Sequence, residues 1–219
     1  MDIVYLCRTG ENEELRFSLR SLRNVAHDQV WIFGGAPDWV RNLRHFRTAA
    51  WGNKHETTNH ALRDACLHPE VSDPFILMND DFYIMRPGKI PVMHRGTIRD
   101  VIAEYEAQGI NSSYVAGMRR TLTMLEARGH ADPLSFELHT PMVIRKHIML
   151  EALNLGAFQR RSVYGALAGL KGKRTTDVKV ANAAAPIPAG RFLSTTDTTF
   201  PIVLPVLEQA FPKPSRYEA

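Results

Sequence analysis

Residues 75–81 read Phe-Ile-Leu-Met-Asn-Asp-Asp, an apolar run that ends in an amide and two carboxylates. Four consecutive apolar residues followed by polar ones are typical of a strand buried on both faces of a sheet. In open α/β sheets, ligands bind at the edge formed by the carboxyl ends of the parallel strands. We therefore expect Asn79, Asp80 and Asp81 to lie at the binding edge of such a sheet.

The chain before this run alternates between strand and helix patterns. Residues 2–7 and 29–33 are nearly continuous apolar runs and are expected to be buried strands. Between them, residues 13–24 carry leucines at helical spacing with arginines in between, which indicates an amphipathic helix. Residues 59–67 favour a second helix, with the two preceding threonines as candidate caps. The order strand, helix, strand, helix, strand predicts a parallel sheet with right-handed crossovers.

After residue 90 the patterns are mostly helical. Helices are expected at residues 97–108, around 119–128 within the segment 112–129, and at 141–153, 163–170 and 201–211, with a short strand at 192–194. No composition shift separates a second folding unit, so we expect one α/β domain over residues 1–219. It would combine a Rossmann-like, mostly parallel sheet in residues 1–90 with a helix-rich half in 91–211 and a loose tail at 212–219.

Composition narrows the class of protein. The 219 residues are 44% hydrophobic and 23% charged, which is ordinary for a globular protein and excludes collagen, coiled coil and bulk disorder. No apolar run approaches the ~20 residues that a membrane span requires. Two cysteines without a CxxC or zinc spacing suit a reducing compartment, so we expect a cytoplasmic protein. The net charge of +4 favours an anionic ligand but is too small to indicate nucleic acid alone.

The acidic pair at the end of the 75–78 strand is the strongest chemical signal. Carboxylate oxygens are the ligands that Mg²⁺ and Mn²⁺ prefer, and these ions bridge the diphosphate of a nucleotide. We therefore predict that Asp81 and Asp80 hold a divalent metal ion, with Asn79 contacting the ligand beside them. The alternative is an Asx turn, in which the same side chains only bond to nearby backbone.

Further candidates come from polar residues beside expected strands and helices. Arg8 and Gly10 follow the first strand, where a guanidinium would meet a phosphate and a glycine permits close approach of the backbone. His139 precedes the helix expected from Pro141 and is a candidate general base. Arg161 is a candidate anion ligand, and Asp197 follows a short apolar run as a second candidate acid.

Several blocks of the chain together resemble the Stealth family of hexose-1-phosphate transferases, which are related to N-acetylglucosamine-1-phosphotransferase. The most specific match runs through Glu14-Leu15-Arg16-Phe17-Ser18-Leu19-Arg20-Ser21 and on to the segment 75–82. His139-Thr140-Pro141 is similar to a His-x-Pro block of the family. Residues 192–197, which end in Asp197, are similar to its last block. The first block is altered, because Cys7-Arg8-Thr9-Gly10 stands where the family has Trp-Val-Asp/Asn-Gly.

The resemblance implies a metal-dependent enzyme that takes a sugar or a sugar-1-phosphate from a nucleotide-sugar donor such as a UDP-sugar. The acceptor hydroxyl would belong to a glycan, a protein or a nucleobase. Catalytic roles fall on His139, Asp80 and Asp197, and metal binding on Asp81 and Asp80. The donor would contact Tyr5, Arg8, Gly10, Arg16, Asn59, Asn79 and Arg161.

Two other hypotheses remain open from the sequence. One is a glycosyltransferase of the kind that phages use on a modified DNA base; the dispersed basic residues leave room for DNA, but no groove-reading motif is visible. The other is a nucleotide-binding module that catalyses no reaction. In that case the acidic pair only stabilises a turn, and His139 only caps a helix.

Overall fold

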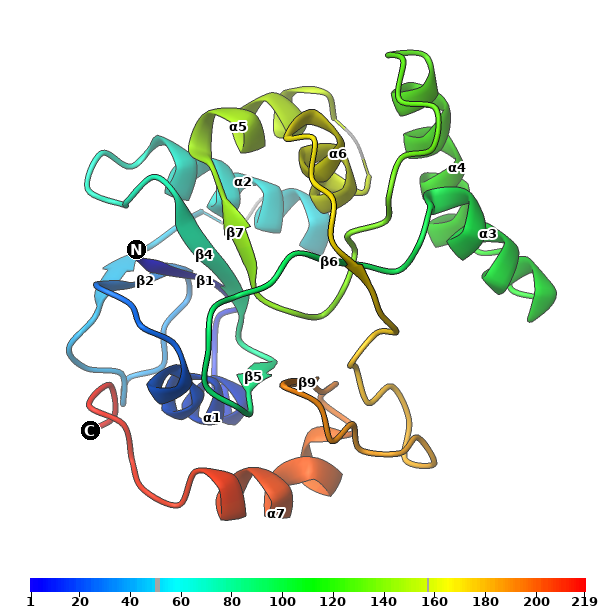
Figure 1. The fold of residues 1–219 in the computed structure, drawn as a ribbon. Coiled ribbons are helices and arrows are strands. Elements are labelled where there is room, and N and C mark those ends of the chain that lie inside the picture. The colour runs from blue at the N-terminus through cyan, green and yellow to red at the C-terminus, as the bar shows by residue number, and fades with distance from the viewer. Residues whose placement is uncertain (50–51, 157) are drawn as a thin grey trace. The chain divides into compact units, whose positions relative to one another are not determined.

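The computed structural model describes residues 1–49, 52–156 and 158–219 (Figure 1). It is an α/β protein with a five-stranded mixed sheet whose strands are mostly parallel. The chain divides into two compact units. Unit 1 comprises residues 1–90, 139–145 and 178–219, and unit 2 comprises residues 91–138 and 146–177. Among the described residues, no helix combines the length and apolar character needed to cross a lipid bilayer.

The five-stranded sheet of unit 1 has the strand order β3-β2-β1-β4-β7. Its parallel strands are β3 (Arg44–Phe46), β2 (Val30–Gly34), β1 (Ile3–Cys7) and β4 (Phe75–Asn79). Every residue of β1 is buried, as expected for a central strand covered on both faces. The strands expected at 2–7, 29–33 and 75–78 are therefore confirmed, whereas the exposed edge strand β3 has no apolar run in the sequence and was not expected.

Two helices cover opposite faces of this sheet (Figure 1). Helix α1 (Glu13–Ser21) and the 3₁₀ turn Leu22–Asn24 connect β1 to β2, and α2 (Lys54–Leu67) connects β3 to β4. The chain thus runs outward from β1 to β2 and β3, and then returns to place β4 on the other side of β1. This reversal of strand order lies between the carboxyl ends of β1 and β4, where open α/β sheets bind ligands.

Two local predictions were wrong. Helix α2 begins at Lys54 because Asn53 and Glu56 form a reciprocal capping box. The expected start at residue 59, with a cap at one of the two preceding threonines, is therefore too late in the chain. The segment expected to be a helix from residue 141 begins as a strand, β7 (Met142–Ile144), which pairs antiparallel with β4. The helix α5 (Lys146–Asn154) starts only after that strand. His139 therefore precedes a strand and not a helix.

A second layer of unit 1 brings the end of the chain to α1. Strand β5 (Phe82–Ile84) pairs antiparallel with β9 (Phe192–Ser194), and α7 (Phe200–Ala210) follows β9. These elements share a buried core with α1 that consists of Phe17, Tyr83, Val180, Leu193, Val203, Leu207 and Phe211. The packing fixes the loop after β9 beside the first turn of α1.

Residues 212–219 were expected to be loose, and the structure shows them bonded to the rest of unit 1. The Glu218 carboxylate accepts hydrogen bonds from Arg20 at 2.7 and 2.9 Å and from Arg16 at 3.2 Å. Tyr217 is buried, and its hydroxyl lies 2.8 Å from the His27 ring. No local sequence pattern indicates these contacts, because the partners lie 190 and 198 residues apart along the chain.

Unit 2 consists mainly of helices. Helices α3 (Ile98–Ala107) and α4 (Ser113–Glu126) pack on each other, as do α5 and α6 (Arg160–Leu167). A two-stranded ribbon pairs β6 (Met93–His94) with β8 (Lys173–Arg174). The helix expected at 97–108 is confirmed, and the helix expected around 119–128 is present but already begins at Ser113. The expectation of a single domain stays a prediction.

Candidate functional site

The residues that follow β1 and β4 place opposite charges on either side of the point where the strand order reverses. Leu6 in β1 is in register with Asn79 in β4, so Arg8 and Asp80 leave the sheet at almost the same level. Asp80 and Asp81 form the tight connection from β4 to β5. The sequence prediction that Asp80 and Asp81 lie at the carboxyl edge of the sheet is therefore confirmed in position, although their roles stay predictions.

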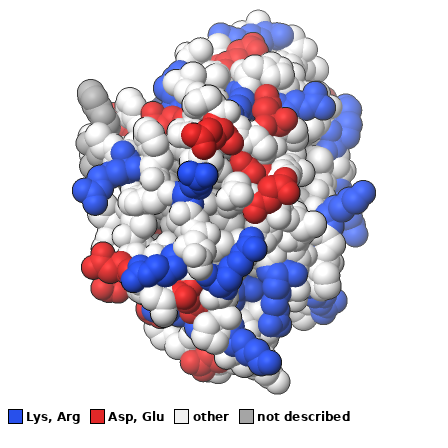
Figure 2. All heavy atoms as spheres, turned by 90° about the vertical axis from the view of Figure 1, so that its left-hand side faces the viewer, with Lys and Arg blue, Asp and Glu red and all other residues white. Residues whose placement is uncertain are grey.

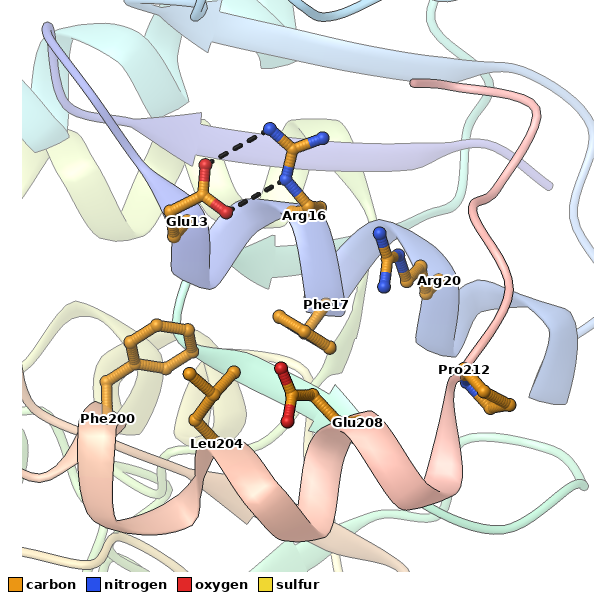
Figure 3. A pocket seen from close by; sticks show the side chains of 8 residues that line it. All are labelled: Glu13, Arg16, Phe17, Arg20, Phe200, Leu204, Glu208 and Pro212. Carbon is orange, nitrogen blue, oxygen red and sulfur yellow. Dashed lines mark hydrogen bonds and ion pairs between the residues drawn. The ribbon is translucent and has the colours of Figure 1, made fainter. Parts of the chain in front are cut away.

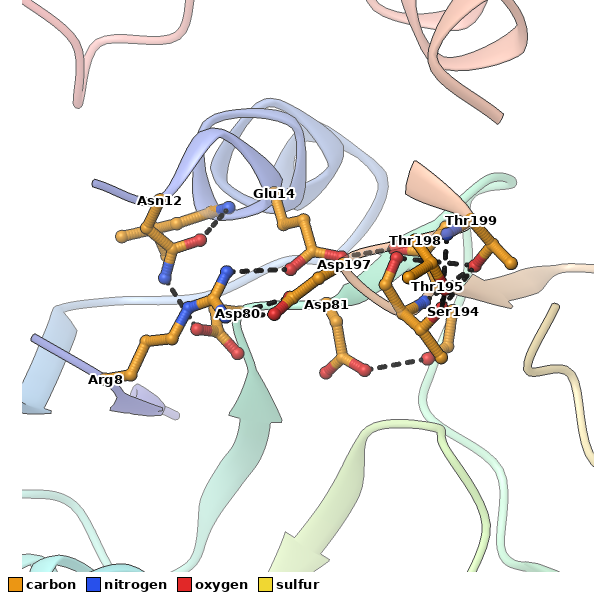
Figure 4. A network of polar contacts seen from close by, with 12 residues as sticks. Arg8, Asn12, Glu14, Asp80, Asp81, Ser194, Thr195, Asp197, Thr198 and Thr199 are labelled. Carbon is orange, nitrogen blue, oxygen red and sulfur yellow. Dashed lines mark hydrogen bonds and ion pairs between the residues drawn. The ribbon is translucent and has the colours of Figure 1, made fainter. Parts of the chain in front are cut away.

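Arg8 links the loop after β1 to the loop after β9 (Figure 4). Its Nη1 atom donates to both carboxylate oxygens of Asp197, at 2.8 and 2.7 Å. Its Nη2 atom lies 3.4 Å from the Glu14 carboxylate, which is only 6% exposed. Glu14 also accepts a 2.7 Å hydrogen bond from the Thr195 hydroxyl. Two candidates that stand 189 residues apart, Arg8 and Asp197, thus meet in one network.

The two neighbouring aspartates have different partners (Figure 4). Asp80 accepts a 2.6 Å hydrogen bond from the side-chain amide of Asn12, whose oxygen caps the first turn of α1. Asp81 lies 3.2 Å from the Lys179 ammonium and accepts a 3.1 Å bond from the Ser194 hydroxyl. Asp80 is therefore fixed by α1, and Asp81 by β9 and the segment that precedes it.

Acidic groups outnumber cations in this network. Burial raises the pKa of Glu14 to about 7, and the negative charges of Asp81, Asp80 and Asp197 add to that rise against the hydrogen bond from Thr195. Burial followed by the charge of Asp81 also raises the pKa of Asp80. Arg8 and Lys179 do not balance the four carboxyl groups, so the site favours the arrival of further positive charge.

His139 belongs to unit 1, as the residues of the network do. Its ring packs edge-on against Phe82, with the ring centroids 6.2 Å apart, and Phe82 directly follows Asp81. The side chain of His139 is half-buried. The structure therefore places the predicted base against Phe82, the residue that follows the acidic pair.

The remaining predicted site residues are dispersed. Tyr5 is fully buried with its hydroxyl 2.9 Å from that of Ser18, so it contacts no ligand in this conformation. Arg16 bonds to Glu13 and Glu218 on another side of α1. Asn79 ends β4 beside the acidic pair, and Asn59 lies within α2. Gly10 lies in the β1–α1 loop at φ +93°, which favours glycine.

Arg161 belongs to unit 2, where its side chain is partly buried. Its guanidinium donates to the Leu138 carbonyl, and its backbone N–H donates to Glu137 at 2.9 Å. Burial lowers the pKa of Arg161 to about 10 despite the opposing charge of Glu137. Its proposed contact with a phosphate stays a prediction.

The sequence reading missed five members of the network, namely Asn12, Glu14, Lys179, Ser194 and Thr195. Asn12 and Glu14 had a usable signal, since an Asn before an amphipathic helix is a typical cap and directs the first helical turn toward the sheet edge. The other three lie in segments without periodic patterns, and only the pairing of β9 with β5 places them here.

The oxygen atoms at the end of β4 are the possible ligands for a divalent metal ion. Among the described residues, no three His, Cys, Asp or Glu side chains form a ready-made metal-binding group. Mg²⁺, however, is usually held by one or two carboxylates, with water and substrate phosphates completing its shell. Asp81, which is partly exposed, and Asp80 supply such oxygen ligands, so the chemistry of the site fits an ion that arrives with a diphosphate.

A separate pocket of about 490 Å³ lies between α1 and α7 (Figure 3). Arg16 and Arg20 line it together with Phe17, Phe200 and Leu204. Arg16 is paired with Glu13 and Glu218, and Arg20 with Glu218, so two carboxylates balance the two guanidinium charges within the chain. We therefore place the candidate site at the Arg8–Asp81 network and not in this pocket.

Comparison with known proteins adds no relative: no protein-family model matches the chain, and no curated protein matches it significantly.

Proposed function

We propose that this protein is a transferase that takes a sugar or a sugar-1-phosphate from a nucleotide-sugar donor, with a Rossmann-like donor-binding half. The observation that carries the proposal is the charged network at the carboxyl ends of β1 and β4, where Arg8, Asp80 and Asp81 converge. The resemblance of residues 14–21, 75–82 and 139–141 to the Stealth family supports the same reaction class. The expected cytoplasmic location stays a prediction.

The acidic side chains of the site are proposed to hold a metal ion, and the basic ones to contact the phosphates. Asp81 and Asp80 would hold Mg²⁺ or Mn²⁺, which when bound supplies positive charge against the diphosphate. Arg8 is held by Glu14 and Asp197 in a position from which its remaining N–H groups would bond to phosphate oxygens. Lys179 adds a second cation beside Asp81. These groups would stabilise the negative charge that develops on the leaving phosphate.

His139 is the group proposed to accept the proton of the acceptor hydroxyl. If the hydroxyl oxygen attacks the β-phosphorus, the bond between that phosphorus and the bridging oxygen breaks, and UMP leaves a UDP-sugar. If it attacks the anomeric carbon, the bond from that carbon to the diphosphate oxygen breaks, and UDP leaves. The nucleotide product therefore distinguishes transfer of the sugar phosphate from transfer of the sugar.

The test measures nucleotide release from UDP-glucose and UDP-N-acetylglucosamine with Mn²⁺ and with EDTA. We expect the wild type to release UMP or UDP only when Mn²⁺ is present. The Asp81→Asn variant should release the nucleotide at least a hundredfold more slowly. Asp132→Asn, which alters an exposed aspartate of unit 2, is the control and should release it at the wild-type rate. A second readout does not depend on the donor, because paramagnetic Mn²⁺ should broaden the NMR signals of residues around Asp80 and Asp81. If neither donor is cleaved and Mn²⁺ leaves these signals sharp, the proposal is wrong.

A further inference from the structure

A pocket of about 390 Å³ lies at the exposed edge of the sheet, beside β3. Its polar lining consists of Asp38, Arg41, Asn42, His45 and Arg47. All five side chains are exposed. The volume falls within the ~300–1,000 Å³ that is usual for small-ligand pockets.

The two arginines of this pocket have no acidic partner among the described residues. Arg41 uses one nitrogen, Nη1, to donate to the backbone carbonyls of Asp38 and Val40, at 2.5 and 2.8 Å. Its other guanidinium N–H groups are not used in these two bonds. The Arg47 side chain takes part in no hydrogen bond or ion pair within the described part of the chain. This contrasts with the pocket between α1 and α7, whose arginines are both bonded to Glu218.

The pocket also holds neutral and acidic groups in fixed places. His45 Nε2 lies 2.9 Å from the Gly34 carbonyl, so it carries the hydrogen and donates, which orients the ring. The Asn42 amide donates to the Arg216 carbonyl at 2.8 Å and holds a backbone turn at φ +55°. Asp38 supplies a carboxylate that accepts hydrogen bonds but repels anions.

The surrounding surface strengthens the positive potential. Arg44 in β3 and Arg216 beside Asn42 are exposed, and neither is paired with an acid in the described part of the chain. Figure 2, which looks at the molecule from the side on which β2 lies in Figure 1, shows Lys and Arg side chains across this face, with Asp and Glu side chains between them. An anion would therefore be attracted to the pocket before it makes direct contact.

The pocket is separate from the Arg8–Asp81 network. Phe46, Phe33, Leu6 and Asn79 share one register row across the parallel strands. Arg47 and Asp80 follow the two ends of that row, three strand spacings or about 14 Å apart. Both sites thus lie on the same edge of the sheet but use different side chains.

We propose that this β3-edge pocket binds a phosphate ester whose organic part carries hydroxyl groups, as a sugar phosphate does. The guanidiniums of Arg41 and Arg47 bond to the phosphate oxygens, because planar N–H donors match that group. The Asp38 carboxylate accepts hydrogen bonds from the hydroxyl groups. A site that binds only a simple anion would not be expected to contain this negatively charged group. This inference does not depend on the proposed transferase activity.

The test is an NMR titration of the intact chain with glucose 6-phosphate, inorganic phosphate and glucose. We expect glucose 6-phosphate to shift the backbone signals of residues 36–47 and to bind more tightly than phosphate, while glucose alone shifts none of them. Signals around Asp80 should move less than those of the pocket. If phosphate binds as tightly as glucose 6-phosphate, if glucose alone shifts this segment, or if residues 36–47 do not respond, the proposal fails.

Two variants separate the two parts of the recognition. Arg47→Gln should weaken binding of glucose 6-phosphate about tenfold, which is the effect of losing one charged hydrogen bond. Arg120→Gln, which alters an exposed arginine of unit 2, is the matched control and should bind like the wild type. Asp38→Asn should weaken glucose 6-phosphate but strengthen inorganic phosphate, because it removes a repelling charge. Equal affinities in Arg47→Gln and Arg120→Gln would refute the assignment, as would a uniform effect of Asp38→Asn on both ligands.

Discussion

The buried carboxyl group of Glu14 should make the stability of the protein depend on pH in a direction opposite to that of most carboxylates. Its pKa rises from the ordinary value of 4.5 to about 7 because burial and nearby acids disfavour the charged form. An unfolded chain loses this proton near pH 4.5, whereas the folded chain keeps it up to about pH 7. Stability from this group is therefore full below pH 4.5 and is lost as the pH rises through 7.

Glu14→Gln removes the titration and keeps the shape of the side chain. At ~1.36 kcal/mol for each pKa unit, the full shift corresponds to about 3 kcal/mol. The exposure of neighbouring Arg8 and Asp197 reduces this, so we expect about 2 kcal/mol between pH 5 and pH 8. The variant should gain that much free energy of unfolding relative to the wild type over this interval.

The assay is urea unfolding of both proteins at half-unit steps from pH 5 to pH 8. The change with pH in the difference between the two free energies of unfolding is the quantity of interest. Any effect of the glutamine amide on the hydrogen bond with Thr195 is the same at every pH and does not contribute to that change. Glu13→Gln is the matched control, since Glu13 is the preceding residue of the same helical turn but is half-exposed, and its difference should stay flat. A difference for Glu14→Gln that is flat, or that falls toward pH 8, would refute the reasoning about its burial.

Two further predictions concern the elements that hold unit 1 together. Burial opposes ionisation of Glu218, but hydrogen bonds from Arg20, Ser215 and Arg16 outweigh it and lower its pKa to about 2. Glu218→Gln should therefore cost about 1–2 kcal/mol at pH 7 and progressively less as the pH falls from 4.5 toward 2; equal urea midpoints at pH 7 would contradict this. Gly34→Ala should destabilise by at least ~2 kcal/mol, because Gly34 has φ +117° and an added Cβ would lie 2.2 Å from the Cys7 carbonyl oxygen. Thermal unfolding checks this, with the open Gly129→Ala, at φ +87°, as the control for backbone conformation alone.

Local patterns in the sequence were sufficient for the elements whose burial is continuous or periodic. The runs at 2–7, 29–33 and 75–78 predict β1, β2 and β4, because a strand covered on both faces must be apolar throughout. β3 and β7 were missed for opposite reasons. β3 is an exposed three-residue edge strand with no apolar run, and β7 follows a proline that is equally suited to the first turn of a helix.

Some residues of the candidate site could likewise be predicted from the sequence, and others could not. Asp80 and Asp81 are evident from the sequence, because the end of a buried parallel strand fixes which edge the next residues occupy. The partners of Asp81 are not evident, since Lys179 and Ser194 reach it only through the pairing of β9 with β5, which joins segments more than 100 residues apart. A pattern of one or two residues carries no information about a partner at that separation.

By itself, then, the sequence determined the parallel core, the edge that carries the acidic pair, and the helices of regular period, because each depends on interactions between neighbours along the chain. Only the tertiary structure decided that Glu14 faces the acidic pair while Arg16 turns away to Glu218, and that the last residues pack against α1. The physical reason is that a helix directs residues two apart to different faces, and which face meets which partner depends on how distant segments pack.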